Sequence, residues 1–404
     1  MGMSRQGYWL SALIAFTQPL VAQAAGEATW LPQEMRGRLA VEHRQFFATG
    51  THGQDTVQPS VVIEPEWYWE WEQGTQSVNL VPFARWDAMD NERSHIDLRE
   101  AIYAYYGDRL ELRAGIGKVF WGVTESQHLV DVINQTDAVE SVDGEAKLGQ
   151  PMVHFAYLAD LGVWELFVLP YFRERTFAGS DGRLTVAGVN TDEARYESSR
   201  GKKHVDLAAR YSVSWDVWDI GLSYFHGTSR DPYFLVEGSD WLRSLVPFYA
   251  QMDQLSVDLQ GLWGDWLWKL EALRRFSLDN HSAVTAGFEY TYVGVADTAW
   301  DVGVLAEYLY DSREKQAPVV GQNDIFAGVR WALNDIAGTE VLFGVSQDLD
   351  DARSQTARLE ASSRLGSAWR WNINAWYFDA DDERDPVYGL RRDNYVEVGL
   401  SYYF

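Results

Sequence analysis

Apolar and polar side chains alternate along almost the whole chain, and this period of two constrains the fold more than any other feature. In the last segment one face comprises Val396, Val398, Leu400, Tyr402 and Phe404. Since successive side chains of a β-strand point to opposite faces of a sheet, the alternation predicts strands. The segments are about 10 to 14 residues long, roughly twice the length of an ordinary globular strand. Strands of this length are typical of barrels that cross a membrane.

The alternation divides the chain into eighteen predicted strands. They cover 35–48, 59–73, 76–89, 94–106, 109–118, 150–160, 162–176, 202–214, 216–228, 250–263, 265–277, 281–294, 298–311, 323–334, 338–348, 354–366, 368–380 and 392–404. Sixteen strands are the alternative, if the pair 94–106 and 109–118 or the pair 338–348 and 354–366 is misassigned. Four prolines lie in or beside these strands: Pro59, Pro65, Pro82 and Pro170. We expect bulges at these positions, because proline cannot donate a ladder hydrogen bond.

The connections between these segments alternate between short and long. The short ones carry Gly, Asp and Asn, as in Gly107-Asp108, Gly264-Asp265 and Gly366-Ser367, and such residues favour tight hairpins. The long ones are 49–58, 119–149, 177–201, 229–249, 312–322 and 381–391. If the first strand starts at the periplasmic side, every tight turn is periplasmic and every long loop is external. This sorting predicts an all-β fold, a transmembrane up-and-down antiparallel β-barrel of about eighteen strands.

The N-terminal 24 residues have the layout of a secretory signal peptide. Arg5 supplies the positive charge, 8–16 is a short apolar stretch, and Ala22-Gln23-Ala24 fits a small-x-small cleavage site. The stretch is too short to cross a membrane, and no later run of about 18 apolar residues follows it. We therefore expect a signal peptide over 1–24 and a barrel over 25–404.

Composition narrows the chemistry that the chain supports. The absence of cysteine excludes disulfides, thiolate metal sites and a cysteine nucleophile. A net charge of −25 argues against a nucleic-acid partner, because phosphate binding requires clustered Lys and Arg. The aromatic share of 14% suits a protein with aromatic belts at the two membrane–water interfaces.

Charged residues lie opposite the apolar stripe of the strands. Because a charge that faces lipid costs several kcal/mol near the bilayer centre, these side chains are expected to face the barrel interior. The basic residues that we select for the interior wall are Arg85, Arg113, Arg358 and Arg370. Two interpretations remain open: a water-filled channel whose wall charges select solutes, or a ladder of ion pairs that fills the lumen.

The connection 119–149 is the most informative loop. Thr124-Glu125-Ser126-Gln127 resembles a capping box, and Leu129, Val132 and Ile133 have helical spacing, which predicts a short amphipathic helix. Six acidic residues in the loop are set against Lys147 alone: Glu125, Asp131, Asp137, Glu140, Asp143 and Glu145. If the loop narrows the barrel, this charge favours cations and opposes anions. Alternatively the acids are solvated, or bind divalent cations among lipopolysaccharide.

Over its whole mature length the chain resembles Gram-negative outer-membrane porins. The features that carry the resemblance are the signal peptide, the terminal Phe404, the strand count and the lack of a plug. Among these, the chain looks like substrate-specific porins or alginate-export-type barrels. The resemblance implies a place in the outer membrane among lipids and lipopolysaccharide, and recognition of Phe404 by the barrel-assembly machinery. In trimeric general porins the third external loop folds inward as a constriction, which implies the same role for 119–149; a loop packed over the mouth is the alternative.

The expected function is therefore a channel for passive, charge-selective diffusion of small hydrophilic solutes, with no cofactor and no metal. The alternative is an export barrel for an anionic polysaccharide or a lipid-related substrate, which needs a track of basic residues such as Arg99, Arg210 and Arg330. An enzyme is not expected. His281 and Ser282 are adjacent, but no hydrolase signature surrounds them, and the other histidines lack metal-type spacing.

Overall fold

The computed structural model describes residues 31–184, 188–190, 192–238 and 244–404, so the predicted signal peptide lies outside the described residues. Eighteen strands form one large sheet. They are β1 (Glu34–Phe46), β2 (Val57–Trp71), β3 (Gln76–Asp87), β4 (His95–Tyr106), β5 (Leu110–Gly117), β6 (Gln150–Ala159), β7 (Gly162–Leu169), β9 (Asp206–Trp215), β10 (Trp218–Thr228), β13 (Gln251–Trp263), β14 (Trp266–Phe276), β15 (His281–Tyr292), β16 (Asp301–Asp311), β17 (Asn323–Ala332), β18 (Glu340–Asp348), β19 (Gln355–Leu365), β20 (Trp369–Asp379) and β21 (Tyr395–Tyr403).

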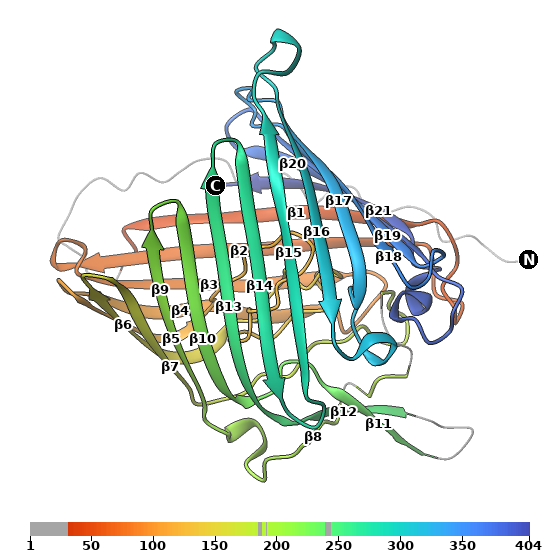
Figure 1. The fold of residues 1–404 in the computed structure, drawn as a ribbon, viewed down its shortest axis with the longest axis horizontal. Coiled ribbons are helices and arrows are strands. Elements are labelled where there is room, and N and C mark those ends of the chain that lie inside the picture. Colours follow the sequence, from red (N-terminus) through yellow and green to blue (C-terminus); the bar gives the residue numbers. More distant parts are fainter. Residues whose placement is uncertain (1–30, 185–187, 191, 239–243) are drawn as a thin grey trace, which may run out of the picture.

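The sheet closes on itself. Each strand pairs antiparallel with its neighbours along the chain, and β21 returns to β1 with Leu400 opposite Val41. In Figure 1 the front strands, green and cyan, cross the red, orange and blue strands behind them at a steep angle, as strongly tilted barrel strands do. The predicted antiparallel barrel of eighteen strands is confirmed. The sixteen-strand alternative is wrong, because β4 and β5 form a regular hairpin, as do β18 and β19.

The prolines disturb the ladder at two of the predicted positions. The register between β3 and β4 shifts between Val81 and Pro82, which is the expected bulge. The β2–β3 ladder is interrupted between Ile63 and Trp67, a stretch that contains Pro65. Pro170 lies just beyond the end of β7, so the predicted strand 162–176 is shorter than expected.

The tight turns have the backbone conformation that their residues predict. Gly264 and Gly366 have φ angles of +62° and +70°, in the left-handed region that glycine adopts without strain. Asp216, in the turn between β9 and β10, has a φ of +55°. The residues of these turns therefore fix the hairpins at one end of the barrel.

A second, three-stranded sheet lies in the long connections at the other end. It is formed by β8 (Arg195–Tyr196), β11 (Tyr233–Glu237) and β12 (Ser244–Tyr249), all within segments that the sequence analysis treated as loops. Figure 1 shows the β11–β12 hairpin extending beyond the ring of barrel strands. Five short 3-10 turns also occur: Glu72–Gly74, Gly201–Lys203, Val295–Asp297, Glu314–Gln316 and Pro386–Leu390. Among the described residues, no helix has the length and apolar character needed to cross a membrane.

Burial in the barrel is inverted relative to a water-soluble protein. On β1, Val41 is 54% exposed, whereas Glu42 and Arg44, on the opposite face of the strand, are 9% and 5% exposed. Further round the ring, Leu222 and Trp164 are exposed while Arg85, Asp97 and other charged residues are buried. The barrel therefore has an apolar outer surface and a charged interior, as a membrane-spanning barrel does.

Candidate channel and its inner loop

The connection 119–149, here called the inner loop, bonds to inward-facing side chains on opposite sides of the ring. On one side Glu140 accepts two hydrogen bonds from Arg85 of β3, at 2.7 and 2.6 Å. On the other side Glu125 accepts from Arg330 of β17 at 2.7 Å and from Arg358 of β19 at 3.0 Å. In the ring of eighteen strands β3 lies seven places from β17 and five from β19, so the inner loop crosses part of the barrel interior between these contacts.

A buried carboxylate of the wall, Glu271 of β14, holds the first half of the inner loop. One of its oxygens accepts hydrogen bonds from the backbone N–H groups of Val123 at 2.7 Å and Thr124 at 2.9 Å. The other accepts from the backbone N–H groups of Leu129 at 2.7 Å and Val130 at 3.2 Å. One side chain therefore fixes two separate turns of the loop backbone.

A second wall carboxylate, Glu307 of β16, binds the residues between those turns. It accepts from the backbone N–H groups of Glu125 and Ser126, both at 2.8 Å, and from the Ser126 hydroxyl at 2.6 Å. These contacts explain why the predicted amphipathic helix is wrong: the described inner loop contains no helix. In a helix the N–H of Leu129 would bond to the carbonyl of Glu125, but Glu271 takes that donor.

The apolar residues of the predicted helix instead pack on the barrel wall. Four loop side chains and six wall side chains form one buried cluster: Trp121, Val130, Val132 and Ile133 with Met152, Phe167, Leu169, Ala208, Phe225 and Met252. The wall residues come from β6, β7, β9, β10 and β13. The inner loop therefore fills this half of the barrel interior with a dry, well-packed contact.

The remaining acidic residues of the loop have different partners. Asp137 is fully buried and accepts from Arg99 of β4 at 2.6 Å and from the Thr176 hydroxyl at 2.7 Å. Asp131 binds the backbone N–H groups of Trp121 and Gly122 and shapes the loop itself. These two acids are therefore structural contacts of the loop, and neither lines the channel path described below.

Asp143 and Glu145 are bound within the loop. Asp143 accepts from the Ser141 hydroxyl and from the backbone N–H of Glu145, and has no cationic partner within 4 Å among the described residues. Glu145 lies 2.7 Å from His128 Nε2. Asp143 therefore carries a charge that no ion pair among the described residues compensates.

The four predicted wall arginines divide into two pairs. Arg85 and Arg358 contact the inner loop, as described above. Arg113 lies 3.6 Å from Glu111 and Arg370 donates to the Ser362 hydroxyl, so the structure does not bring these two to the loop. Glu271, Glu307 and Arg44 lie on the inward face that the alternation predicts, but they were not singled out as contacts of the loop. Arg44 donates to the Glu140 carbonyl at 2.9 Å. The loop partners of all three are about 100 or more residues away along the chain.

Three adjoining cavities run along the half of the barrel that the apolar cluster leaves free. The outer cavity has a volume of about 370 Å³, the central cavity about 470 Å³ and the periplasmic cavity about 400 Å³. The outer and central cavities share the lining residues Ser141, Asp143, Arg358 and Trp376. The central and periplasmic cavities share Glu360, Asn374 and Glu397. This series, here called the channel path, lies between the inner loop and the wall that runs from β17 through β21 to β1.

Acidic residues outnumber basic ones in the central cavity. Its six carboxylates belong to Glu125, Glu140, Asp143, Glu145, Glu360 and Glu397. Its cationic residues are Arg44 and Arg358, together with His128. The charged side chains that line the central cavity are therefore predominantly acidic.

Comparisons with known proteins bear on the fold. No protein-family model matches the chain, and a search of curated proteins found no match. OccAB3 of Acinetobacter baumannii matches 92% of this chain over 99% of its own, with 9% identity and a TM-score of 0.50. A BenF-like porin from Pseudomonas fluorescens Pf-5 matches 92% of this chain over 97% of its own, with 10% identity and a TM-score of 0.50. The chain has the porin fold.

The porin fold and the inverted burial together give the location of the protein. A closed barrel leaves no unpaired strand edge in the hydrocarbon layer, and its apolar outer surface suits contact with lipid. The chain is therefore a barrel that spans a membrane, which agrees with the outer-membrane location expected from the sequence.

His128 gives this porin-fold barrel an expected pH dependence. Burial alone would lower the pKa of His128, but Glu145 and Glu271 on either side of the ring outweigh it and raise the pKa to about 10. Because the pKa is raised, protonation of His128 stabilises the folded loop. This stabilisation is complete at pH values below the ordinary histidine pKa and is lost as the pH rises through about 10. Single-channel recordings from about pH 8 to about pH 11 should therefore show growing current noise. His128→Gln should be noisy at every pH; an identical pH response in this variant would contradict the assignment.

Proposed function

We propose that the protein is an outer-membrane channel through which small hydrophilic solutes diffuse passively. The observation that carries the proposal is the channel path, whose three cavities adjoin through shared polar lining residues. Barrels of about 16 to 18 strands leave an aqueous interior, and here the inner loop occupies half of it. The loop therefore acts as the constriction, and the free half of the barrel is the route for solute.

The proposed selectivity is for cations. Asp143 lines the central cavity without an ion pair, and the ion pairs of the other acids with Arg44, Arg85, Arg330 and Arg358 only partly compensate the charge. A small cation entering the cavity exchanges part of its hydration for carboxylate oxygens, whereas an anion meets a repulsive potential. Of the acids proposed for the constriction, Asp143 is the one that both faces the path and lacks a cationic partner among the described residues.

The proposal is tested by the current through the refolded chain in a planar bilayer under a salt gradient. Steady openings whose reversal potential indicates cation preference are the expected result. A complete lack of openings in a folded, heat-resistant barrel would overturn the channel function. Steady openings with anion preference would keep the channel but overturn the selectivity.

Removing two path acids should weaken the cation preference. We expect Asp143→Asn combined with Glu360→Gln to lower the cation-to-anion permeability ratio about two- to threefold, because the local potential falls with the charge. The matched control is Asp160→Asn, since Asp160 lies in a periplasmic turn, pairs with Arg109 and is 82% exposed. A permeability ratio that responds equally to both variants would show that general surface charge sets the preference.

The export alternative has weaker support. An anionic polysaccharide needs basic groups that are free to bind it, whereas Arg99 is held by Asp137, Arg210 by Asp258 and Arg330 by Glu125, each at 2.6–2.7 Å. These three arginines are therefore engaged with carboxylates and are not free to bind a polyanion. Passive diffusion is the function that the contacts favour.

A further inference from the structure

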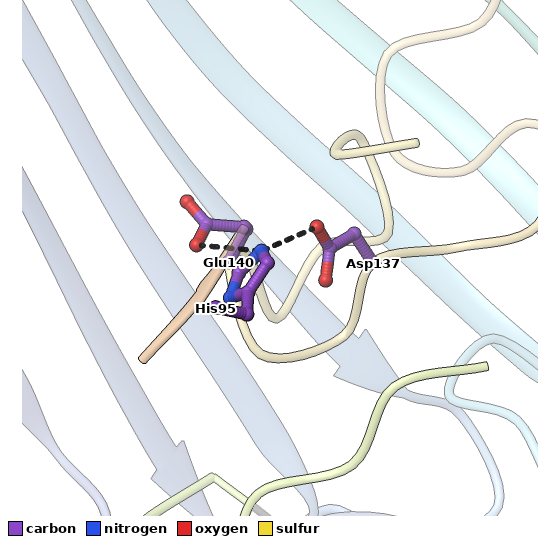
Figure 2. A group of neighbouring side chains, drawn as sticks. All are labelled: His95, Asp137 and Glu140. Atoms are coloured by element: carbon purple, nitrogen blue, oxygen red, sulfur yellow. Dashed lines mark ion pairs between the residues drawn. The ribbon is translucent and has the colours of Figure 1, made fainter. Parts of the chain in front are cut away.

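Three side chains from distant parts of the chain converge where the inner loop meets β4. They are His95, the first residue of β4, and Asp137 and Glu140 of the inner loop (Figure 2). The Nε2 atom of His95 lies 3.6 Å from an oxygen of Asp137 and 3.9 Å from an oxygen of Glu140. One donor atom from each residue lies within 4.8 Å of the other two.

The orientation of the His95 ring leaves one nitrogen without a partner. Its Nδ1 lies 2.9 Å from the carbonyl oxygen of Arg93, which can only accept, so Nδ1 carries the hydrogen. The Nε2 atom is buried and makes no hydrogen bond among the described residues. In the neutral ring, the lone pair of Nε2 therefore faces two carboxylates at distances too long for hydrogen bonds. Either a second proton on the ring or a cation held between the three groups would balance this arrangement.

We propose that this cluster binds a divalent transition-metal ion of the Zn²⁺ type. The donors are His95 Nε2 and one carboxylate oxygen each from Asp137 and Glu140. With Zn–ligand distances of about 2.0 to 2.2 Å, neighbouring ligands of a tetrahedral site lie about 3.3 to 3.6 Å apart, close to the two distances observed. Three protein ligands leave the fourth position for water.

The surroundings of the three donors fit a metal site. A metal-binding histidine commonly donates its other N–H to a backbone carbonyl, as His95 does to Arg93. Ligating carboxylates are commonly hydrogen-bonded in turn, and here Asp137 accepts from Thr176 and Arg99, and Glu140 from Arg85. The imidazole ligand favours Zn²⁺ over Ca²⁺, which prefers six to eight oxygen ligands.

The two arginines beside the site are shared with other carboxylates, which limits their repulsion of a metal ion. Arg85 also donates to Glu42 at 2.6 Å, and Arg99 to Asp97 at 3.1 Å. Each guanidinium therefore compensates charge outside the site as well as inside it. Because two ligands belong to the inner loop and one to β4, a bound ion would fasten the loop to the wall.

The test is a calorimetric titration of the full chain, folded in detergent and treated with a chelator, with Zn²⁺ and separately with Ca²⁺. We expect one Zn²⁺ per chain and no comparable binding of Ca²⁺. His95→Ala and Asp137→Asn should each weaken Zn²⁺ binding more than about tenfold, whereas His52→Ala, at an exposed loop histidine, should leave it unchanged. Zn²⁺ binding that is absent in the parent, or unchanged in His95→Ala, would overturn the proposal.

Co²⁺ absorption on the unmodified chain makes the test independent of whether the variants fold. Visible bands of a four-coordinate Co²⁺ ion that disappear on addition of Zn²⁺ are expected, and a spectrum of octahedral, hydrated Co²⁺ would overturn the proposal. If the cluster holds only a proton, neither titration shows binding. Since both measurements are made in detergent, their outcome does not depend on the proposed channel function.

Discussion

A Glu271→Ala variant should conduct several times more current than the parent chain, with noisier openings. Glu271 is fully buried, and its carboxylate accepts hydrogen bonds from four backbone N–H groups, those of Val123, Thr124, Leu129 and Val130. Each buried donor left without an acceptor costs about 1–3 kcal/mol. Alanine offers no acceptor, so the inner loop cannot keep its conformation and withdraws from the barrel interior.

Two further variants separate the anchoring role from a change of charge. Glu271→Gln keeps one acceptor oxygen but turns an amide group toward N–H donors, so its conductance should lie between those of the parent and Glu271→Ala. Glu340→Gln removes a carboxylate from the periplasmic cavity, where no hydrogen bond joins Glu340 to the loop among the described residues. An equal rise of conductance in Glu271→Ala and Glu340→Gln would attribute the effect to charge and remove Glu271 from the anchoring of the loop.

The strands could be predicted from the sequence because every one of them obeys the same local rule. A barrel strand shows one face to lipid and the other to the interior, so Val41 and Glu42 alternate in the sequence as they do in exposure. The turns were predictable for the same reason, since Gly264 and Gly366 meet a purely local need for a positive φ angle. The small external sheet was missed because its short strands lie in segments without sustained alternation.

The conformation of the inner loop could not be predicted, because it is decided by residues far away in the sequence. The pattern from Thr124 to Ile133 is locally helical, but Glu271 binds the N–H groups of Leu129 and Val130 that a helix would use. In the same way, no metal-binding spacing in the sequence involves His95. Asp137 and Glu140 are distant from it along the chain and come close to it only in the folded barrel. Charge and alternation selected four arginines for the interior wall without assigning them partners. Arg85 and Arg358 contact the loop, whereas Arg113 and Arg370 do not, so charge alone does not specify the partner.

A Val130→Asp variant should open the half of the barrel that the apolar cluster now fills. Val130 is fully buried among loop and wall side chains, and the new carboxylate would lie beside the carboxylate of Glu271, which binds the backbone N–H of Val130. A buried charge without a partner costs several kcal/mol even after the structure relaxes. The loop would therefore detach from β6, β7, β9, β10 and β13, and the pore should widen.

The measurement is single-channel conductance, together with cleavage of the inner loop by an added protease. Val130→Asp should raise both the conductance and the rate of cleavage, whereas Val130→Ala, which removes two methyl groups without adding charge, should change them much less. Unaltered conductance and cleavage in Val130→Asp, in a barrel that still resists heat, would mean that the cluster does not hold the loop. Glu271 holds the loop backbone and the apolar cluster holds the loop side chains, so either change alone releases the same loop. The conductance of the double variant Val130→Asp with Glu271→Ala should therefore be only slightly higher than that of either single variant.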